Sequence, residues 1–249
     1  MQTHPTEPIA LPDRARLLLV ALVLFAAYQL PHGVGNDYLI LLFPLAAWWG
    51  SRALGFGALR AWYLDARTGW LRFLVLGLVL AVLAKCAAIV IGTQAGVYRF
   101  AWKDDIVATG LAGALAWIAF STFIPSVAED ILTRGLVLRA FPRLAQRWTF
   151  ILVSAALYVL NHIYRLHKGP AEWGMLFCFG LAYGAALWRT RTLWAAVGLH
   201  WGWNLANALL DLLGTTDLAQ PALAPFYSGS AHLLLLACVL GFMRPVGDS

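Results

Sequence analysis

The sequence Ala-Glu-Asp-Ile-Leu-Thr-Arg-Gly, residues 128–135, ends an apolar run that starts near Ile106 and holds no charged residue before Glu129. Hydrocarbon cannot solvate carboxylates, so two adjacent acids at the end of a membrane-length helix need a partner or a function. Two later stretches offer polar partners at helical spacing, Tyr158-Val-Leu-Asn-His162 and His200-Trp-Gly-Trp-Asn204. We therefore expect these three stretches to carry the chemistry of the chain.

The composition indicates a membrane protein. The chain has 249 residues, of which 61% are hydrophobic and 12% charged, whereas a soluble domain carries about 25% charged residues. We predict an all-α, polytopic membrane helix bundle. The three cysteines are far apart in apolar runs, so we interpret them as packing residues and not as a disulfide framework or a zinc cluster.

Eight membrane helices are expected from the apolar runs, together with an interfacial segment at 50–71. The expected spans are 17–30, 38–49, 71–92, a run from Ile106 to just before Pro142, 148–164, 172–188, 193–212 and 231–243. We divide the chain into a cytoplasmic tail (1–16), N-terminal membrane helices with the interfacial segment (17–105), a core that contains the three polar stretches (106–215) and a C-terminal membrane helix (216–249).

The arginines and lysines indicate the orientation of this bundle. With eight spans and a cytoplasmic N-terminus, 13 Arg and Lys residues lie on the cytoplasmic side and 4 on the other. This bias predicts that both termini are cytoplasmic, and it explains the net charge of +6 without a nucleic-acid partner. Lys85 lies inside the third expected span; it either snorkels to the interface, which we favour, or faces a polar interior.

Helix geometry predicts different roles for the two adjacent acids, Glu129 and Asp130. Asp130 and Arg134 are four residues apart and share a helix face, so we predict a structural ion pair. Glu129 is rotated about 100° from Asp130 and is free to point into the bundle. We therefore expect Glu129 to be the working acid.

The histidines complete a candidate hydrolytic site. Tyr158 lies one turn before His162, and His200 shares one helix stripe with Asn204 and Asn207. Glu129 and His162 could activate a water while His200 and Asn204 stabilise an oxyanion. Alternatively, Glu129, His162 and His200 could bind zinc, although the usual His-Glu-x-x-His signature is absent. We favour the metal-free mechanism, with no cofactor. A serine mechanism through Ser154 is weaker because no buried Asp would orient a triad.

The motifs Glu-Asp-x-x-x-Arg, Tyr-x-x-x-His, Phe-x-x-Gly and His-x-x-x-Asn occur in this order over residues 106–215. This pattern resembles the CPBP family, the intramembrane proteases related to CAAX prenyl endopeptidase (Rce1-like) and to bacterial Abi proteins. The resemblance implies that Glu129 with His162 activates water, that His200 and Asn204 bind the oxyanion, and that Arg134 is structural. The chain departs from the family pattern at Asp130, where the family has Glu, and at Tyr158, where it has Phe.

The resemblance also implies an endopeptidase that hydrolyses a peptide bond in a membrane-anchored protein or peptide. Nothing in residues 1–105 selects the substrate or shows whether it is prenylated. Composition favours a bacterial inner membrane. We also expect the active-site cavity to open toward the cytoplasm. A non-catalytic membrane scaffold or a transporter is the competing hypothesis, although we find no internal repeat that would favour a transporter.

Overall fold

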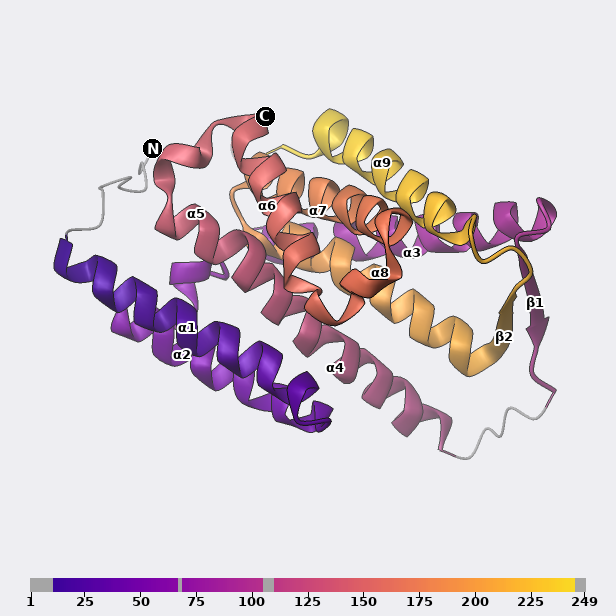
Figure 1. Ribbon diagram of the computed structural model, residues 1–249, viewed down its shortest axis with the longest axis horizontal. Coiled ribbons are helices and arrows are strands. Elements are labelled where there is room, and N and C mark those ends of the chain that lie inside the picture. Colours follow the sequence, from indigo (N-terminus) through magenta and orange to yellow (C-terminus); the bar gives the residue numbers. More distant parts are fainter. Residues whose placement is uncertain (1–10, 67–68, 105–109, 245–249) are drawn as a thin grey trace.

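The computed structural model describes residues 11–66, 69–104 and 110–244, and these are almost entirely helical (Figure 1). Short 3₁₀ segments lie at Asp37–Leu42, Arg60–Trp62, Pro142–Ala145 and Ile163–Lys168. The α-helices are α1 (Leu11–Gly33), α2 (Phe43–Ala53), α3 (Trp70–Gln94), α4 (Leu111–Asp130), α5 (Leu136–Ala140), α6 (Arg147–Asn161), α7 (Pro170–Thr190), α8 (Leu193–Leu213) and α9 (Ala224–Phe242).

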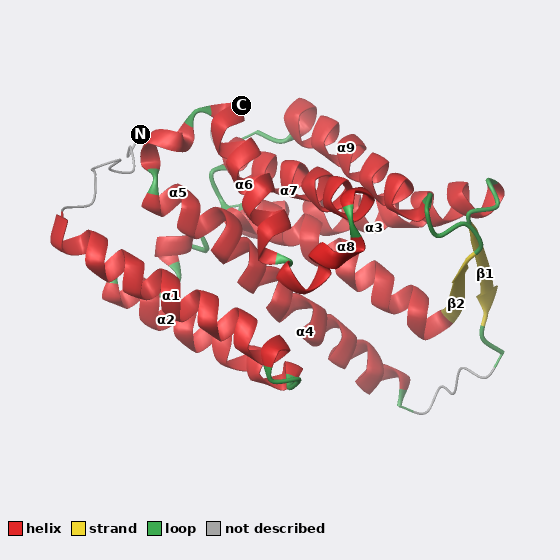
Figure 2. Ribbon diagram, viewed as in Figure 1, coloured by secondary structure: helices red, strands yellow, loops and turns green. Residues whose placement is uncertain are grey.

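Two short strands depart from the all-α prediction. β1 (Tyr98–Trp102) and β2 (Gly214–Leu218) pair antiparallel, with Tyr98 opposite Leu218 (Figure 2). Each strand has only five residues, which is too short to stand out as a pattern in the sequence. Because β1 follows α3 and β2 follows α8, the strand pair brings the ends of these two helices to the same side.

Helices α3 and α8 run side by side in the same direction, with glycines at their contact. A Cβ atom on Gly198 would lie 2.3 Å from the carbonyl oxygen of Leu74, and one on Gly202 would lie 2.6 Å from that of Leu78. The two backbones can approach this closely only because these positions lack a side chain. The shared direction agrees with the alternation expected for the third and seventh spans.

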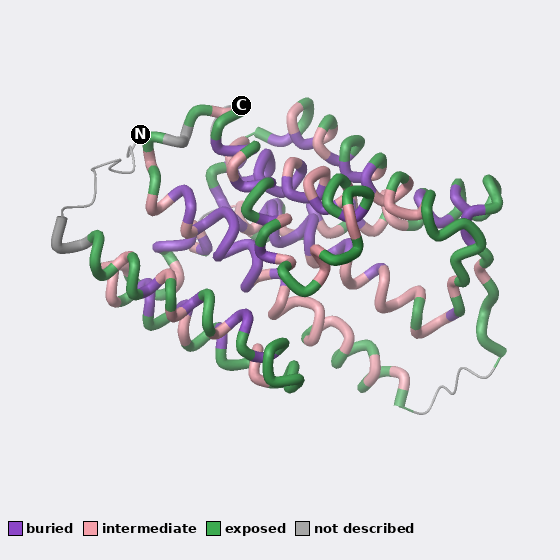
Figure 3. The backbone as a smooth tube through the Cα atoms, viewed as in Figure 1, coloured by how far each residue is buried: buried purple, intermediate pink, exposed green. Residues whose placement is uncertain are grey.

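Gly180 and Gly184 lie at the contact between α7 and α6. A Cβ atom on Gly180 would meet Ala155 Cα at 2.6 Å, and Gly184 faces Ser154. These contacts press α7 against α6. Figure 3 shows that buried residues concentrate in this central part of the bundle, whereas α1 and α2 alternate between buried and exposed residues.

Four segments in the described part of the chain are long and apolar enough to cross a membrane: Arg14–Gly33, Trp70–Gln94, Leu111–Ala140 and Ala224–Phe242. Helices α7 and α8 have 21 residues each but are not among these four, and they are largely buried inside the bundle. The chain is thus an all-α membrane-type bundle, while the count of eight spans and the cytoplasmic termini stay predictions.

Several predicted boundaries are wrong. Helix α1 begins at Leu11, before the expected start of the first span at residue 17, and it continues past Pro31 to Gly33. Helix α9 begins at Ala224 and not at Ala231. Ile106 lies outside the described residues, and the four predicted parts of the chain stay predictions.

Candidate functional site

The segment that carries the acidic pair is continuous from α4 to α5 and ends at Ala140, before Pro142, as predicted. Between the two α-helices, Ile131–Gly135 forms one π-helical turn. Single π-helical turns are frequent at functional sites, because the widened backbone changes where side chains point. Here the turn follows Glu129 and Asp130 directly and includes Arg134.

The predicted ion pair between Asp130 and Arg134 is present, and both side chains are fully buried. The Arg134 guanidinium also donates to Thr133 Oγ1 at 2.8 Å. Its carbon Cζ lies 4.8 Å from the ring centre of Tyr158 and 5.0 Å from that of Tyr183. Two aromatic faces and one carboxylate therefore compensate the buried cation, as expected for a structural arginine.

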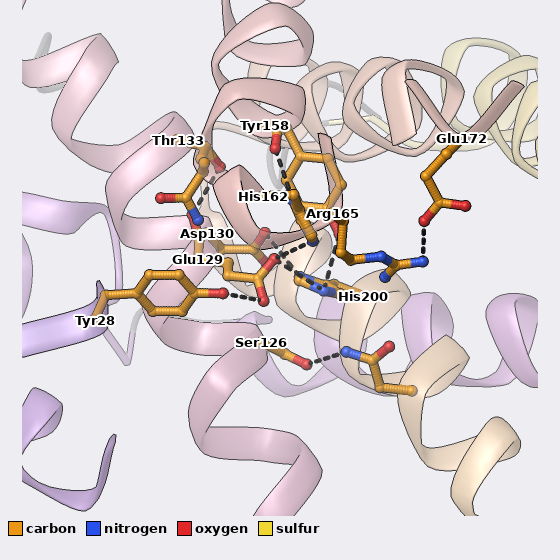
Figure 4. Close-up of polar contacts among 12 residues, drawn as sticks. Tyr28, Ser126, Glu129, Asp130, Thr133, Tyr158, His162, Arg165, Glu172 and His200 are labelled. Carbon is orange, nitrogen blue, oxygen red and sulfur yellow. Dashed lines mark hydrogen bonds and ion pairs between the residues drawn. The ribbon is translucent and has the colours of Figure 1, made fainter. Parts of the chain in front are cut away.

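Glu129 points into the bundle, as the sequence predicts, and its two oxygens have different surroundings. Oε1 accepts a hydrogen bond of 2.6 Å from the hydroxyl of Tyr28 in α1. Oε2 is buried and accepts no hydrogen bond from the described residues. It lies 3.5 Å from Nε2 of His162 and 3.8 Å from Nε2 of His200 (Figure 4). One oxygen is therefore fixed, and the other faces two imidazole nitrogens.

His162 does not lie within a helix, as its assignment to the fifth span implied, but directly follows α6. Its Nδ1 lies 2.8 Å from the carbonyl oxygen of Tyr158. A carbonyl oxygen can only accept, so Nδ1 carries the proton. When the ring is neutral, the lone pair of Nε2 therefore faces Glu129.

His200 is held from both sides of its ring. Nδ1 lies 3.3 Å from Asp130 Oδ1, and Nε2 lies 3.3 Å from the hydroxyl of Tyr158. The ring of Tyr183 stacks on the imidazole, with 4.9 Å between centroids. The carboxylate of Asp130 requires a proton on Nδ1, so Nε2 accepts from Tyr158 when the ring is neutral. His200 must therefore gain a second proton, on Nε2, before it can donate to an oxyanion.

These contacts account for both departures from the family pattern. The shorter side chain of Asp130 reaches both Arg134 and His200. The added hydroxyl of Tyr158 has a partner in His200. The other oxygen of Asp130, Oδ2, is buried and has no hydrogen-bond partner among the described residues.

Asn204 lies one turn beyond His200, and its Nδ2 donates to Ser126 Oγ at 3.1 Å. Ser126 in turn donates to the carbonyl oxygen of Thr122 at 2.8 Å. The amide of Asn204 is thus held against α4, one turn before Glu129. Our sequence reasoning missed Ser126.

The sequence reasoning also missed Tyr28 and Tyr183. A signal for Tyr28 was present, because the dipeptide Tyr28-Gln29 interrupts an apolar run. Both side chains face inward, and Gln29 donates to the backbone oxygen of Asn161 at 2.9 Å. Tyr183 gave no such signal, because an aromatic residue in a membrane helix is common.

The alternatives from the sequence have less geometric support. In the described part of the chain, no group of three or more His, Cys, Asp or Glu side chains is arranged to hold a metal ion. The zinc alternative therefore stays a hypothesis. Ser154 is fully buried against Gly184, and its hydroxyl has no hydrogen-bond partner among the described residues. The serine mechanism thus gains no support.

Comparison with known protein families returned a match over residues 111–206, to the family described as type II CAAX prenyl endopeptidase Rce1-like. No curated protein and no solved structure matched the chain. The matched segment contains every motif on which the sequence-based resemblance rests. Residues 111–206 are therefore similar to the Rce1-like family of type II CAAX prenyl endopeptidases, in agreement with the resemblance noted from the motifs.

Proposed function

We propose that the chain is an intramembrane endopeptidase in which Glu129 activates the water that hydrolyses a peptide bond. The observation that carries this proposal is the buried Oε2 of Glu129, which has no hydrogen-bond partner among the described residues and faces Nε2 of both His162 and His200. A water held among these three atoms would have one acceptor in the carboxylate and another in the lone pair of His162. Such an arrangement is suited to general-base catalysis.

The chemical steps follow from these positions. The water oxygen attacks the scissile carbonyl carbon while its proton passes to Glu129. The carbonyl oxygen becomes an oxyanion, which the amide of Asn204 and the doubly protonated ring of His200 would stabilise. When the tetrahedral intermediate collapses, the proton on Glu129 passes to the leaving nitrogen. The carboxylate is then restored, and an acid and an amine are released.

The proposed substrate is a membrane-anchored protein or peptide, because the site lies inside a membrane-type bundle. Glu129 lies eleven residues before the helical end at Ala140, which is about 16 Å along a helix axis. We propose a bacterial inner membrane with both termini cytoplasmic and a site that opens toward the cytoplasm. The arginine bias in the sequence supports this orientation.

The test is a comparison of membranes from cells that express the wild type, Glu129→Gln or Asp217→Asn. Asp217→Asn is the matched control, because it removes a carboxylate from β2, away from the site. We expect new peptide termini, detected by mass spectrometry, with the wild type and the control only. The same termini in all three samples would contradict the role of Glu129. Their absence from all three would favour a non-catalytic scaffold or transporter.

Metal dependence has a separate test on the purified protein. We expect cleavage to survive dialysis against a chelator, because Glu129 and His162 can activate water without a metal. Loss of activity on chelation, with recovery on added zinc, would support the zinc alternative at Glu129, His162 and His200.

A further inference from the structure

A second polar feature lies beyond the catalytic residues, in a cavity of about 330 Å³. Side chains from α3, α7, α8, α9 and both strands line it. Its polar lining includes Lys85, Arg165, Glu172, Asn207 and Asp211. A membrane helix rarely carries such groups without a role, because burying them away from water is costly.

Lys85 is the one cation of this cavity without an ion pair among the described residues. Arg165 already pairs with Glu172. The ammonium of Lys85 instead lies 4.9 Å above the ring of Trp203, and no carboxylate oxygen of the described residues lies within 4.0 Å of it. The nearby acid Asp211 lines the same cavity but is exposed. Lys85 thus lines a polar cavity of the bundle, which supports the polar-interior alternative; snorkelling stays a prediction.

The cavity adjoins the catalytic residues. Asn207 lies three residues beyond Asn204 on α8, and no hydrogen bond within the described part of the chain occupies its amide. The backbone N–H of Arg165 donates to the carbonyl oxygen of His162 at 2.8 Å. In Figure 4, Arg165 lies between the two histidines and Glu172. A peptide held at Glu129 could therefore continue into this cavity.

The distance from the catalytic residues to Lys85 follows from the packing of α3 on α8. A Cβ atom on Gly202 would meet Leu78 Cα at 2.8 Å, so these two residues are level. The Cα atom of Lys85 lies seven residues further along the parallel helix, about 13 Å beyond that of His200 along the axis. Its ammonium, however, lies over the ring of Trp203, only three residues beyond His200. An extended peptide covers about 3.4 Å per residue, so about four residues or fewer would reach the ammonium.

We propose that this cavity binds a carboxylate of the substrate within about four residues of the scissile bond, with Lys85 as the cation and Asn207 as a hydrogen-bond donor. This inference rests on the proposed function and defines part of its substrate. The carboxylate is either an Asp or Glu side chain or the free C-terminal carboxylate of the peptide. Both sources present the same group to Lys85.

The experiment measures peptide binding to Glu129→Gln, which is expected not to cleave, with and without Lys85→Met. The probes are short alanine–leucine peptides that end as a free acid or as an amide, and amidated versions with one Glu or Gln at each position. We expect one carboxylate-bearing probe to bind about tenfold or more tightly than its neutral partner. A preference for the free acid identifies the C-terminal source, and a preference for Glu at one position identifies the side-chain source.

Two further variants separate this role from a structural one. Lys85→Met should abolish the preference, whereas Lys168→Met, a charge removed outside the cavity lining, should keep it. Asp211→Asn should tighten binding of the acidic probe, because it removes a competing anion. If Lys85 only stabilises Asp211, Lys85→Met and Asp211→Asn would both lower the unfolding temperature. Neither variant would then change the ratio of acidic to neutral probe binding. That result would overturn the proposal.

The two proposals can fail separately. Cleavage that Glu129→Gln abolishes, without any carboxylate preference, would overturn the Lys85 site and leave the protease standing. A Lys85-dependent preference without cleavage would keep the binding site and remove the protease.

Discussion

The hydroxyl of Tyr28 donates a hydrogen bond of 2.6 Å to Oε1 of Glu129 and thereby joins α1 to the end of α4. Both residues are buried, with exposed fractions of 5% and 7%. Tyr28 lies outside residues 111–206, the segment that matches the family. The candidate site therefore extends beyond the family segment into the N-terminal helices.

Replacing Tyr28 by Phe tests whether this bond positions the proposed base. The ring remains, so α1 should still pack, but Oε1 of Glu129 loses its donor. A hydrogen bond to a charged group contributes about 1.5–3 kcal/mol, which corresponds to roughly a tenfold to hundredfold fall in kcat. We expect KM to stay within about twofold, because the hydroxyl contacts Glu129 and not the substrate. Initial rates over a range of substrate concentrations separate the two constants.

Gln29→Leu provides the matched control for that experiment. Gln29 also joins α1 to the core, through Asn161, but does not contact Glu129. Gln29→Leu should lower the unfolding temperature, but it should lower kcat much less than Tyr28→Phe does. An equal loss of kcat in the two variants would mean that Tyr28 acts only by docking α1.

The buried ion pair between Asp130 and Arg134 should contribute to the stability of the fold. Arg134→Met should lower the free energy of unfolding by about 3–5 kcal/mol, because it leaves the buried carboxylate of Asp130 uncompensated. The double variant with Asp130→Asn should lose less than the sum of the two single variants, since neither charge then remains. Thermal unfolding in detergent measures all three. Additive losses would show that the two residues do not act as a pair.

The sequence carried enough information to predict the residues of the proposed catalytic site. The apolar run before Glu129, the four-residue spacing of Asp130 and Arg134, and the motifs at His162 and His200 follow from helix periodicity and the cost of burying charge. These are short-range rules. For that reason they predicted which helix faces point inward at Glu129, His200 and Asn204, whereas His162 lies near Glu129 just after the end of α6.

The remaining contacts depend on how distant helices meet. Tyr28 is about a hundred residues from Glu129 in sequence, and a single apolar helix gives no sign of which neighbour it will contact. The position of Lys85 depends on how α3 is rotated against α8, and that rotation is set by Gly198 and Gly202. The π-helical turn was likewise invisible, because Ile131–Gly135 carries an ordinary helical pattern.

The contact between α3 and α8 can be tested with a matched glycine pair. Gly198→Ala would put Cβ 2.3 Å from the backbone oxygen of Leu74, so the helices must separate. Overpacking of this kind costs about 1–3 kcal/mol or more. Gly113→Ala is the control, since nothing lies within 4 Å of its added Cβ. We expect a lower unfolding temperature for Gly198→Ala only, and equal effects of the two variants would contradict the close contact.

The proposed stabilisation of the transition state by the amide of Asn204 can be tested directly. If Asn204 donates to the oxyanion, Asn204→Ala should lower kcat by about 10²–10³-fold with little change in KM, because the interaction forms only when the carbonyl becomes charged. Ser126→Ala removes the hydroxyl that now accepts from Asn204 Nδ2 but leaves the donor itself. Its kcat should fall by about tenfold or less, since the amide loses its orientation and not its chemistry. Asn204→Asp, which keeps the size and loses the donor, should be as inactive as Asn204→Ala. An active Asn204→Asp variant would assign Asn204 to packing, with His200 left as the donor to the oxyanion.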